Sequence, residues 1–197
     1  NMEVYFLTKK PEYLEYSKEW AEHNQWKGAT SNNKAEWRST YGESPEYVLF
    51  GDWQVCFQTY ADLYKLDPDT IKIARAREVM EYQMSTSKLD YWHWVDALYM
   101  VMPVMVKMYD ITKNPLYLEK LHQYLTVTDS IMYDREVGLY YRDAKYPYPF
   151  HKTINEKKDF WSRGDGWAFA AFAKVLKQLP AEDKYREEYI TRFQTMA

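Results

Sequence analysis

The stretch YWHWVDALYM, from Tyr91 to Met100, places one carboxylate at the start of an otherwise apolar segment. From Ala97 to Val106 no side chain carries a charge. A helix that is apolar all round is normally buried on every side. An aspartate at its entry, Asp96, therefore caps the helix, accepts hydrogen bonds, or takes part in chemistry. The aromatic residues before it, including Trp94, form a rigid surface of the kind on which sugars stack.

The sequence on either side of this segment contains an internal repeat. Each copy reads as the end of one helix, a short turn with proline, and the start of a second helix. Proline suits the first position of a helix, where its missing N–H would have no partner in any case. The copies are VYFLTKKPEYLE from Val4, LYKLDPDTIKIA from Leu63, MYDITKNPLYLE from Met108 and, more weakly, VLKQLPAEDKYREEY from Val175.

The helices on the two sides of each turn differ in character. Those before the turn are apolar nearly all round, over residues 52–66, 94–111 and 166–179. Those after it are charged and amphipathic, over residues 11–24, 69–84, 115–132 and 182–197. Buried helices that alternate with half-exposed ones predict two concentric layers, and therefore an all-α (α/α)6 six-hairpin barrel, or toroid. An open helical solenoid is the alternative architecture.

The number of hairpins indicates an incomplete barrel. Six hairpins of this repeat length would need roughly 340 residues, whereas the chain has 197 and holds about four. We therefore expect residues 1–197 to form a single α/α-barrel catalytic domain that is truncated at both ends. Such a fragment would expose part of its inner helix surface.

The composition excludes several classes of partner. A net charge of −3 without a clustered basic face argues against nucleic acid. The longest apolar run, about ten residues, is too short to span a bilayer. No histidine–cysteine cluster has zinc-ligand spacing and no glycine-rich phosphate loop is present.

The connections between hairpins predict where a site would lie. The two long connections, 25–51 and 133–163, both lead into inner helices, so they emerge at the end of the barrel that carries the N-termini of those helices. Three inner helices begin with distinctive residues at that end: Asp52 in FGDWQVCFQTYADLY, Asp96, and Arg163 in WSRGDGW. Each has a structural reading as a cap or a surface ion pair. Their predicted convergence at one mouth favours a functional site.

Four stretches carry a resemblance to a known family: GDWQVCFQTYADLY, WHWVDALYMVMPV, GLYYRDAKY and FWSRGDGWAFAAFAKVL. The chain resembles the unsaturated rhamnogalacturonyl hydrolases, glycoside hydrolase family 105, and the neighbouring unsaturated glucuronyl hydrolases of family 88. The resemblance implies a soluble bacterial enzyme, cytoplasmic or periplasmic, that acts on oligosaccharides left by polysaccharide lyases, as in pectin degradation. It implies release of a 4,5-unsaturated uronic acid from the non-reducing end, without a metal or organic cofactor.

The resemblance also implies roles for single residues. Asp96 matches the general acid and base, which protonates C4 of the double bond and then activates the water that attacks C5. Asp52 matches a second aspartate that positions substrate or water. The implied substrate-binding residues are Arg163, for the substrate carboxylate, together with Trp161, Trp167, Arg142 and Trp94.

Two positions depart from the family pattern. Asp165 stands where the family usually has asparagine, and a carboxylate beside Arg163 is expected to weaken its hold on an anion. Arg142 stands where better-known members carry histidine, which adds positive charge near the sugar. We also expect His23, His122 and His151 to be solvated.

Two other classes of function stay open at this point. One is a non-catalytic toroid that binds carbohydrate or acts as a scaffold. The other is a different α/α-barrel carbohydrate enzyme, a lyase or an epimerase. Epimerases of this fold rely on paired histidines at the barrel mouth, which this sequence does not offer. A lyase would place a Tyr/His or Lys base in an open groove.

Overall fold

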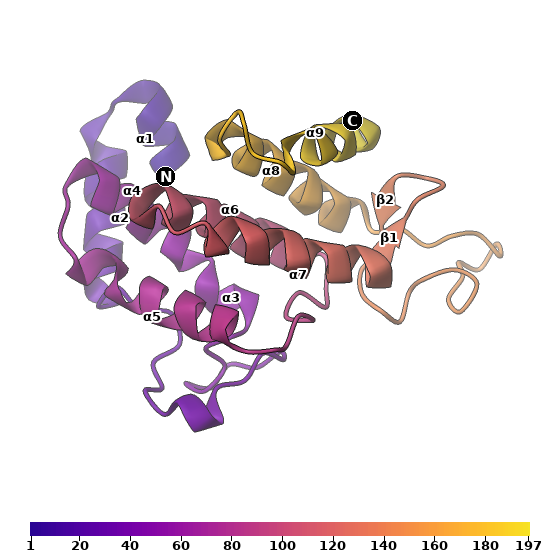
Figure 1. Cartoon of the computed structure of the whole chain (residues 1–197), viewed down its shortest axis with the longest axis horizontal. Coiled ribbons are helices and arrows are strands. Elements are labelled where there is room, and N and C mark those ends of the chain that lie inside the picture. The colour runs from indigo at the N-terminus through magenta and orange to yellow at the C-terminus, as the bar shows by residue number, and fades with distance from the viewer. The chain divides into compact units, whose positions relative to one another are not determined.

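The computed structural model describes all residues from 1 to 197 (Figure 1). Its secondary structure is helical apart from one short β-hairpin, so the predicted all-α class is confirmed. The chain forms two compact units, Asn1–Thr86 and Ser87–Ala197, and each is described by itself below. None of the helices combines the length and the apolar character that a membrane span requires.

The first unit contains two helical hairpins joined by a long connection. Its helices are α1 (Met2–Thr8), α2 (Pro11–His23), the short 3-10 helix η1 (Lys34–Glu36), α3 (Gly51–Gln54), α4 (Cys56–Leu66) and α5 (Ile71–Ser85). Lys9 adopts a left-handed conformation between α1 and α2, and Pro11 occupies the first helical position as the repeat predicted. The core lies between α4 and α5, where Phe57 and Met80 are fully buried.

Buried polar side chains fix the long connection of the first unit. The guanidinium of Arg75 on α5 donates to the carbonyl oxygens of Ala29 and Ser31, at 3.0 and 2.6 Å. The amide of Gln54 donates to Gln83 Oε1 at 2.9 Å, which joins α3 to α5. Because buried polar groups are costly when unpaired, these contacts specify one path for the loop.

The second unit holds α6 (Asp96–Thr112), α7 (Leu116–Met132), β1 (Tyr133–Asp134), β2 (Leu139–Tyr140), α8 (Ser162–Gln178) and α9 (Arg186–Met196). In Figure 1, α7 and α8 run beside α6, and α9 covers α8. Every residue of α6 from Val101 to Met108 is buried, including Pro103 within the helix. The predicted burial of this inner helix is therefore confirmed.

Residues 166–179 were predicted to form a helix that is apolar nearly all round, and this prediction is wrong in detail. In α8 one stripe is buried, formed by Ala168, Ala171, Phe172 and Val175, at the spacing of one helix face. The opposite face carries polar side chains such as Lys177, which is exposed. The helix is therefore amphipathic, because Lys174, Lys177 and Gln178 interrupt its apolar pattern.

The β-hairpin is a feature that the helical pattern did not predict. Tyr133 pairs with Tyr140 and Asp134 with Leu139. Asp134 Oδ1 accepts the backbone N–H groups of Glu136 and Val137, and Gly138 has a φ of 81°. An aspartate that bonds its own turn and a glycine at positive φ are the local signals for this reversal.

A buried ion pair joins the hairpin to α7 and α9. Arg192 Nη2 lies 2.8 Å from Asp129 Oδ2, and Arg192 Nη1 donates to Tyr140 Oη at 2.6 Å. Tyr140 Oη in turn donates to Asp129 Oδ1 at 2.6 Å. All three side chains are buried, so each depends on the others for its polar partners.

We expect Asp129→Asn to lower the free energy of unfolding by about 3 kcal/mol, because it leaves the buried Arg192 guanidinium without a countercharge. Chemical denaturation of the full chain measures this. Lys152→Gln, which removes the more exposed pair with Glu156, is the matched control and should cost less than about 1 kcal/mol. Equal losses in the two variants would contradict the importance of the buried pair.

Candidate active site

Asp96 is the first residue of α6, and the chain before it is held by the loop after β2. The N–H of Val95 donates to the carbonyl oxygen of Arg142 at 2.9 Å, and Trp94 and Asp143 form an antiparallel bridge. Asp96 Oδ1 is buried and has no hydrogen-bond partner. A carboxylate that serves only as a cap would use its oxygens on backbone N–H groups, so the capping interpretation does not account for this oxygen.

Burial and the nearby charges act in opposite directions on the pKa of Asp96. Burial raises the pKa of its carboxyl group above the ordinary value, while the guanidiniums of Arg163 and Arg142 act to lower it. Burial is the larger influence, so the net shift favours the protonated form. A general acid needs a raised pKa of this kind.

A pocket of about 390 Å³ lies in the same unit, lined by Arg142, Tyr146, Asp159, Phe160, Trp161 and Arg163. The guanidinium carbon of Arg163 lies 4.1 Å from the centre of the Trp161 ring, and that of Arg142 lies 5.9 Å from it. Arg163 is exposed and makes no hydrogen bond or ion pair. The pocket therefore combines a flat aromatic surface with cationic donors, which suits an anionic sugar.

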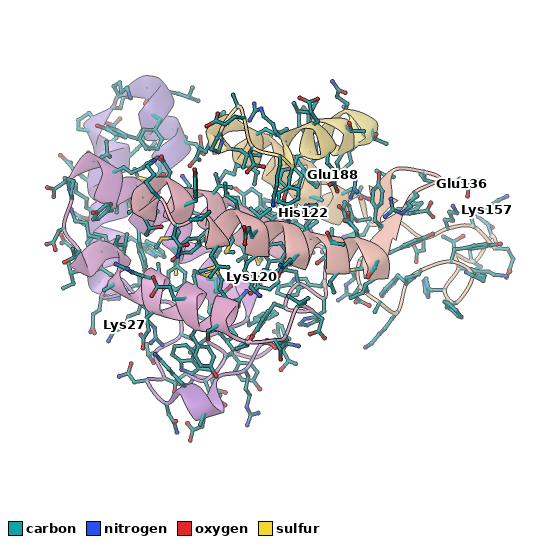
Figure 2. All side chains as sticks on the ribbon, in the orientation of Figure 1. Lys27, Lys120, His122, Glu136, Lys157 and Glu188 are labelled. Atoms are coloured by element: carbon teal, nitrogen blue, oxygen red, sulfur yellow. The ribbon has the colours of Figure 1, made fainter.

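The loop that carries most of this pocket, residues 141–161, is tied together at its base. The rings of Tyr141 and Phe160 stack with centres 4.7 Å apart. Lys158 Nζ lies 2.7 Å from Asp134 Oδ2 and 2.7 Å from Glu136 Oε2. In Figure 1 the loop extends beyond the β-hairpin, and Figure 2 shows Glu136 on the hairpin turn close to this loop. These contacts hold the two ends of the loop together.

Asp134 is the centre of this attachment. Burial alone would raise its pKa, but hydrogen bonds from Lys158 and Tyr141 lower the pKa of Asp134 to about 2. Its carboxylate therefore stays ionised at every pH at which a protein of this kind would act. The sequence offered no pattern for this interaction, because Asp134 and Lys158 are distant in the chain.

The start of α8 approaches α6 at a glycine. A Cβ atom on Gly164 would lie 2.5 Å from Val95 Cγ1 and 2.8 Å from Trp161 Cε3, both closer than real contacts allow. Gly164 thus permits the close contact that sets Trp161 and Arg163 beside the start of α6. A Cβ on Gly166, two residues later, would meet nothing within 4 Å.

Asp165 does not lie where the sequence suggested. Its Oδ1 accepts the backbone N–H of Tyr140 at 2.8 Å, and the residue is buried. It forms no ion pair with Arg163, and its hydrogen bond joins β2 to the first turn of α8. Burial raises the pKa of Asp165 to about 6, although the N–H of Tyr140 opposes this shift.

The other predicted residues are placed as follows. Trp167 is 36% exposed, packs against Tyr99 with ring centres 4.5 Å apart, and does not line the pocket. Trp94 is half-buried and lies beside His93, with ring centres 5.0 Å apart. The roles of these tryptophans stay predictions. Sequence reasoning missed Tyr146, Asp159 and Phe160. The signal for Tyr146 was the aromatic-rich segment YYRDAKYPYPF, whereas Asp159 and Phe160 directly precede Trp161.

Asp52 belongs to the first unit. It is exposed in the first turn of α3 and lines a hollow of about 310 Å³. A Cβ on Gly28 would overlap the carbonyl oxygen of Trp53, so the chain after α2 closely approaches α3 beside this hollow. Trp20, Lys27 and Thr59 are among the other lining residues. The expectation that Asp52 shares a cavity with Asp96 stays a prediction.

The expectation that the histidines are solvated is wrong for His122, whereas His23 is exposed and the side chain of His151 is 38% exposed. His122 of α7 stacks on Tyr185 with ring centres 3.6 Å apart, and its Nδ1 lies 3.9 Å from Glu188 Oε2, a pair visible in Figure 2. His151 Nε2 lies 2.6 Å from Asp159 Oδ2 at the pocket. The neighbours of His122 come from a distant segment of the chain, whereas those of His151 come from its own loop. No group of three or more histidine, cysteine or acidic side chains is close enough to bind a metal.

Comparison of Gly164→Ala with Gly166→Ala tests the close approach of α8 to α6. We expect Gly164→Ala to cost about 1–3 kcal/mol of stability because its methyl group overlaps Val95 and Trp161. Gly166→Ala should gain about 0.5–1 kcal/mol, because alanine favours the helix and the space is open. Denaturant midpoints of the two variants measure the difference, and a stabilising Gly164→Ala would contradict the packing.

Asp165→Asn should make stability depend on pH in a defined direction. A carboxyl group whose pKa is raised on folding costs nothing below its unfolded pKa, near 4, and destabilises increasingly as pH rises through about 6. Asparagine keeps the acceptor for Tyr140 without the charge. We expect the variant to gain about 1–3 kcal/mol at pH 8 and almost nothing at pH 4. Denaturation at both pH values measures it, and an equal gain at the two would contradict a raised pKa.

Comparisons with known proteins agree with this fold. The family model described as Glycosyl Hydrolase Family 88 matches residues 1–197. A solved structure titled as a glycosyl hydrolase family 88 protein from Bacteroides vulgatus has a TM-score of 0.98 and 94% identity, over 99% of this chain and 56% of its own. Another, titled a polysaccharide lyase, has a TM-score of 0.98 and 74% identity, over 99% of this chain and 55% of its own.

More distant matches extend the comparison. A family 105 glycoside hydrolase from C. acetobutylicum shares the fold, with a TM-score of 0.69 and 20% identity over 98% of this chain and 55% of its own. A curated relative from Formosa agariphila, named an unsaturated 3S-rhamnoglycuronyl hydrolase, is 35% identical over 117 residues, which are 57% of this chain and 31% of that protein. The chain spans about half the length of the structures it matches. The predicted fold class, part of a six-hairpin α/α barrel, is confirmed.

Proposed function

Since this chain belongs to glycosyl hydrolase family 88, we propose that it forms part of a single α/α-barrel catalytic domain. The proposed enzyme releases a 4,5-unsaturated uronic acid from the non-reducing end of oligosaccharides made by polysaccharide lyases, such as a rhamnogalacturonan disaccharide. The observation that carries the proposal is the environment of Asp96. Its Oδ1 is buried and has no hydrogen-bond partner, and its pKa is influenced by the guanidiniums of Arg142 and Arg163, which line the pocket. The name of the Formosa relative supports the unsaturated substrate class.

In the proposed reaction, Asp96 acts first as an acid and then as a base. The protonated carboxyl group gives its proton to C4 of the C4=C5 double bond, and the ring oxygen stabilises the positive charge that develops at C5. The resulting carboxylate then takes a proton from the water that attacks C5. The hemiketal formed in this way collapses, the glycosidic bond breaks, and the neighbouring sugar leaves with a proton.

The pocket supplies the binding contacts for this reaction. Arg163 presents five N–H donors without a protein partner, and a planar guanidinium matches a carboxylate. Trp161 gives the sugar ring a flat apolar surface. When the substrate carboxylate neutralises Arg163, the lowering influence of that guanidinium on Asp96 weakens, which favours the proton that the reaction needs. Asp52 is proposed to position substrate or water, and Trp94 and Trp167 to complete the binding surface.

A polysaccharide lyase is the second candidate, because the 74% identical structure carries that title. The two reactions have opposite effects on the double bond, which a lyase forms and the proposed hydrolase consumes. Ultraviolet absorbance of the conjugated double bond therefore separates them in one assay. A fall in absorbance with lyase-generated oligosaccharides supports the hydrolase, and a rise with intact polysaccharide supports the lyase.

We expect Asp96→Asn to lower kcat about a thousandfold to ten-thousandfold while substrate binding stays nearly unchanged, because the amide keeps the shape of the acid but cannot transfer its proton. Initial rates and equilibrium binding on the full-length protein measure the two effects. Asp110→Asn, near the other end of α6, is the control and should keep its activity. More than about a tenth of wild-type activity in Asp96→Asn would contradict the role, as would cleavage of saturated uronides at a comparable rate.

A further inference from the structure

We propose that His151 is a positioning residue. Held by Asp159, it fixes the ring of Tyr146, whose hydroxyl group in turn holds the guanidinium of Arg142 in the lining of the pocket. His151 is not itself a lining residue, so it acts without touching the substrate. The inference rests on the proposed function, in which Arg142 is one of two cations that face an anionic sugar, and it deepens that function by naming what sets the position of this cation.

The first link is the contact between His151 and Asp159. His151 Nε2 lies 2.6 Å from Asp159 Oδ2. Because a carboxylate only accepts hydrogen bonds, Nε2 carries the proton of this bond, and the bond sets the direction of the imidazole ring. Asp159 directly precedes Phe160, whose ring stacks on Tyr141 at the base of the loop. The imidazole ring is therefore anchored to the part of the loop that is already fixed.

The second link is the contact between the rings of His151 and Tyr146. Their centres lie 4.5 Å apart and their planes are inclined by 56°. A tilted pair of rings at this separation is a favourable packing arrangement. The backbone N–H of Tyr146 donates to the carbonyl oxygen of Asp143 at 3.1 Å, so the main chain is fixed at the same residue. The His151 ring then limits how far the Tyr146 side chain can turn.

The third link is the hydrogen bond from Arg142 to Tyr146. Arg142 Nη1 donates to Tyr146 Oη at 3.1 Å, and the guanidinium carbon lies 5.6 Å from the centre of the tyrosine ring. Asp143 Oδ2 lies 3.9 Å from Arg142 Nε, which is too far for a hydrogen bond. The Arg142 side chain is 53% exposed, and a long exposed arginine has many rotamers to lose. Tyr146 is therefore the main polar restraint on this guanidinium.

The two cations of the pocket are thus held by different means. Arg163 stacks on Trp161, with its guanidinium carbon 4.1 Å from the ring centre, whereas the Arg142 guanidinium lies 5.9 Å from that centre. Arg142 consequently depends more on the tyrosine behind it. Other ion pairs of the loop do not reach His151 or Asp159: Lys152 pairs with Glu156, and Lys158 pairs with Asp134 and Glu136. The pair of His151 with Asp159 is therefore the one ionic contact that supports Tyr146.

Kinetics of the full-length protein on the unsaturated rhamnogalacturonan disaccharide test the inference. We expect His151→Ala to raise KM about threefold to tenfold and to change kcat less than about twofold, because a guanidinium that is no longer held must be ordered when the substrate binds. Tyr146→Phe removes only the hydroxyl group that holds Arg142, and its effect should be of the same size. Partial unfolding would lower kcat and leave KM unchanged, so the two constants separate positioning from a structural defect.

A double-mutant cycle tests whether His151 acts through Arg142. In the Arg142→Gln protein, His151→Ala should leave KM unchanged, because the group that it positions is absent. Glu156→Gln, which breaks the exposed pair with Lys152 in the same loop, is the matched control and should keep the wild-type KM. His151→Gln, which keeps an N–H donor for Asp159 but no ring for Tyr146, takes the place of His151→Ala if that variant does not fold.

The inference is overturned by an unchanged KM in both His151→Ala and Tyr146→Phe. An equal rise in KM in the wild-type and Arg142→Gln backgrounds also overturns it, because His151 would then act independently of Arg142. Both results leave the proposed function standing, since the wild-type protein still consumes the double bond. Absence of turnover by the wild-type protein removes the proposed function itself, so the two failures are distinguishable.

Discussion

The burial of α6 on every side is the constraint on which the second unit depends. Because Val101 to Met108 have no access to water, α7 and α8 must cover the helix, and the loop before it must end where the buried segment begins. Asp96 stands at that boundary. Burial of its carboxyl group raises its pKa, so it holds a proton more readily than usual. The two guanidiniums of the pocket are nevertheless close enough to lower that pKa in part. The position that makes the helix a core element thus also makes its first residue a candidate acid.

The close contact of α8 with the start of α6 determines where the pocket residues lie relative to Asp96. The absence of a side chain at Gly164 lets the first turn of α8 contact Val95, the residue before Asp96. That contact sets Trp161 and Arg163 beside the start of α6, and the loop after β2 completes the pocket with Arg142. A small change in the helix contact would therefore move the aromatic surface and a cation together, relative to the acid.

The helical hairpins and the position of Asp96 could be predicted because they depend on local patterns. Apolar runs, prolines at helix starts and the spacing of charges determine which helices are buried, and α6 followed this reasoning closely. The burial of α8 did not follow this reasoning, because Lys174 and Lys177 give the helix a polar face opposite its buried stripe. The pairing of Asp134 with Lys158 and of Asp165 with the N–H of Tyr140 joins residues distant in the chain, and no periodicity reveals such contacts. The role of Tyr146 beside Arg142 was hidden for the same reason.

The attachment of the 141–161 loop depends on the carboxylate of Asp134, which stays ionised far into the acid range. With a pKa of about 2, Asp134 keeps its contacts with Lys158 and Tyr141 across the whole range in which Asp165 changes its charge. That stabilisation is present above the ordinary aspartate pKa and is lost only as pH falls through about 2. The attachment of the loop and the charge of Asp165 are therefore separated on the pH scale. Between pH 4 and 8 the contacts of Asp134 hold the two ends of the loop together, while Asp165, which binds the N–H of Tyr140, changes its charge.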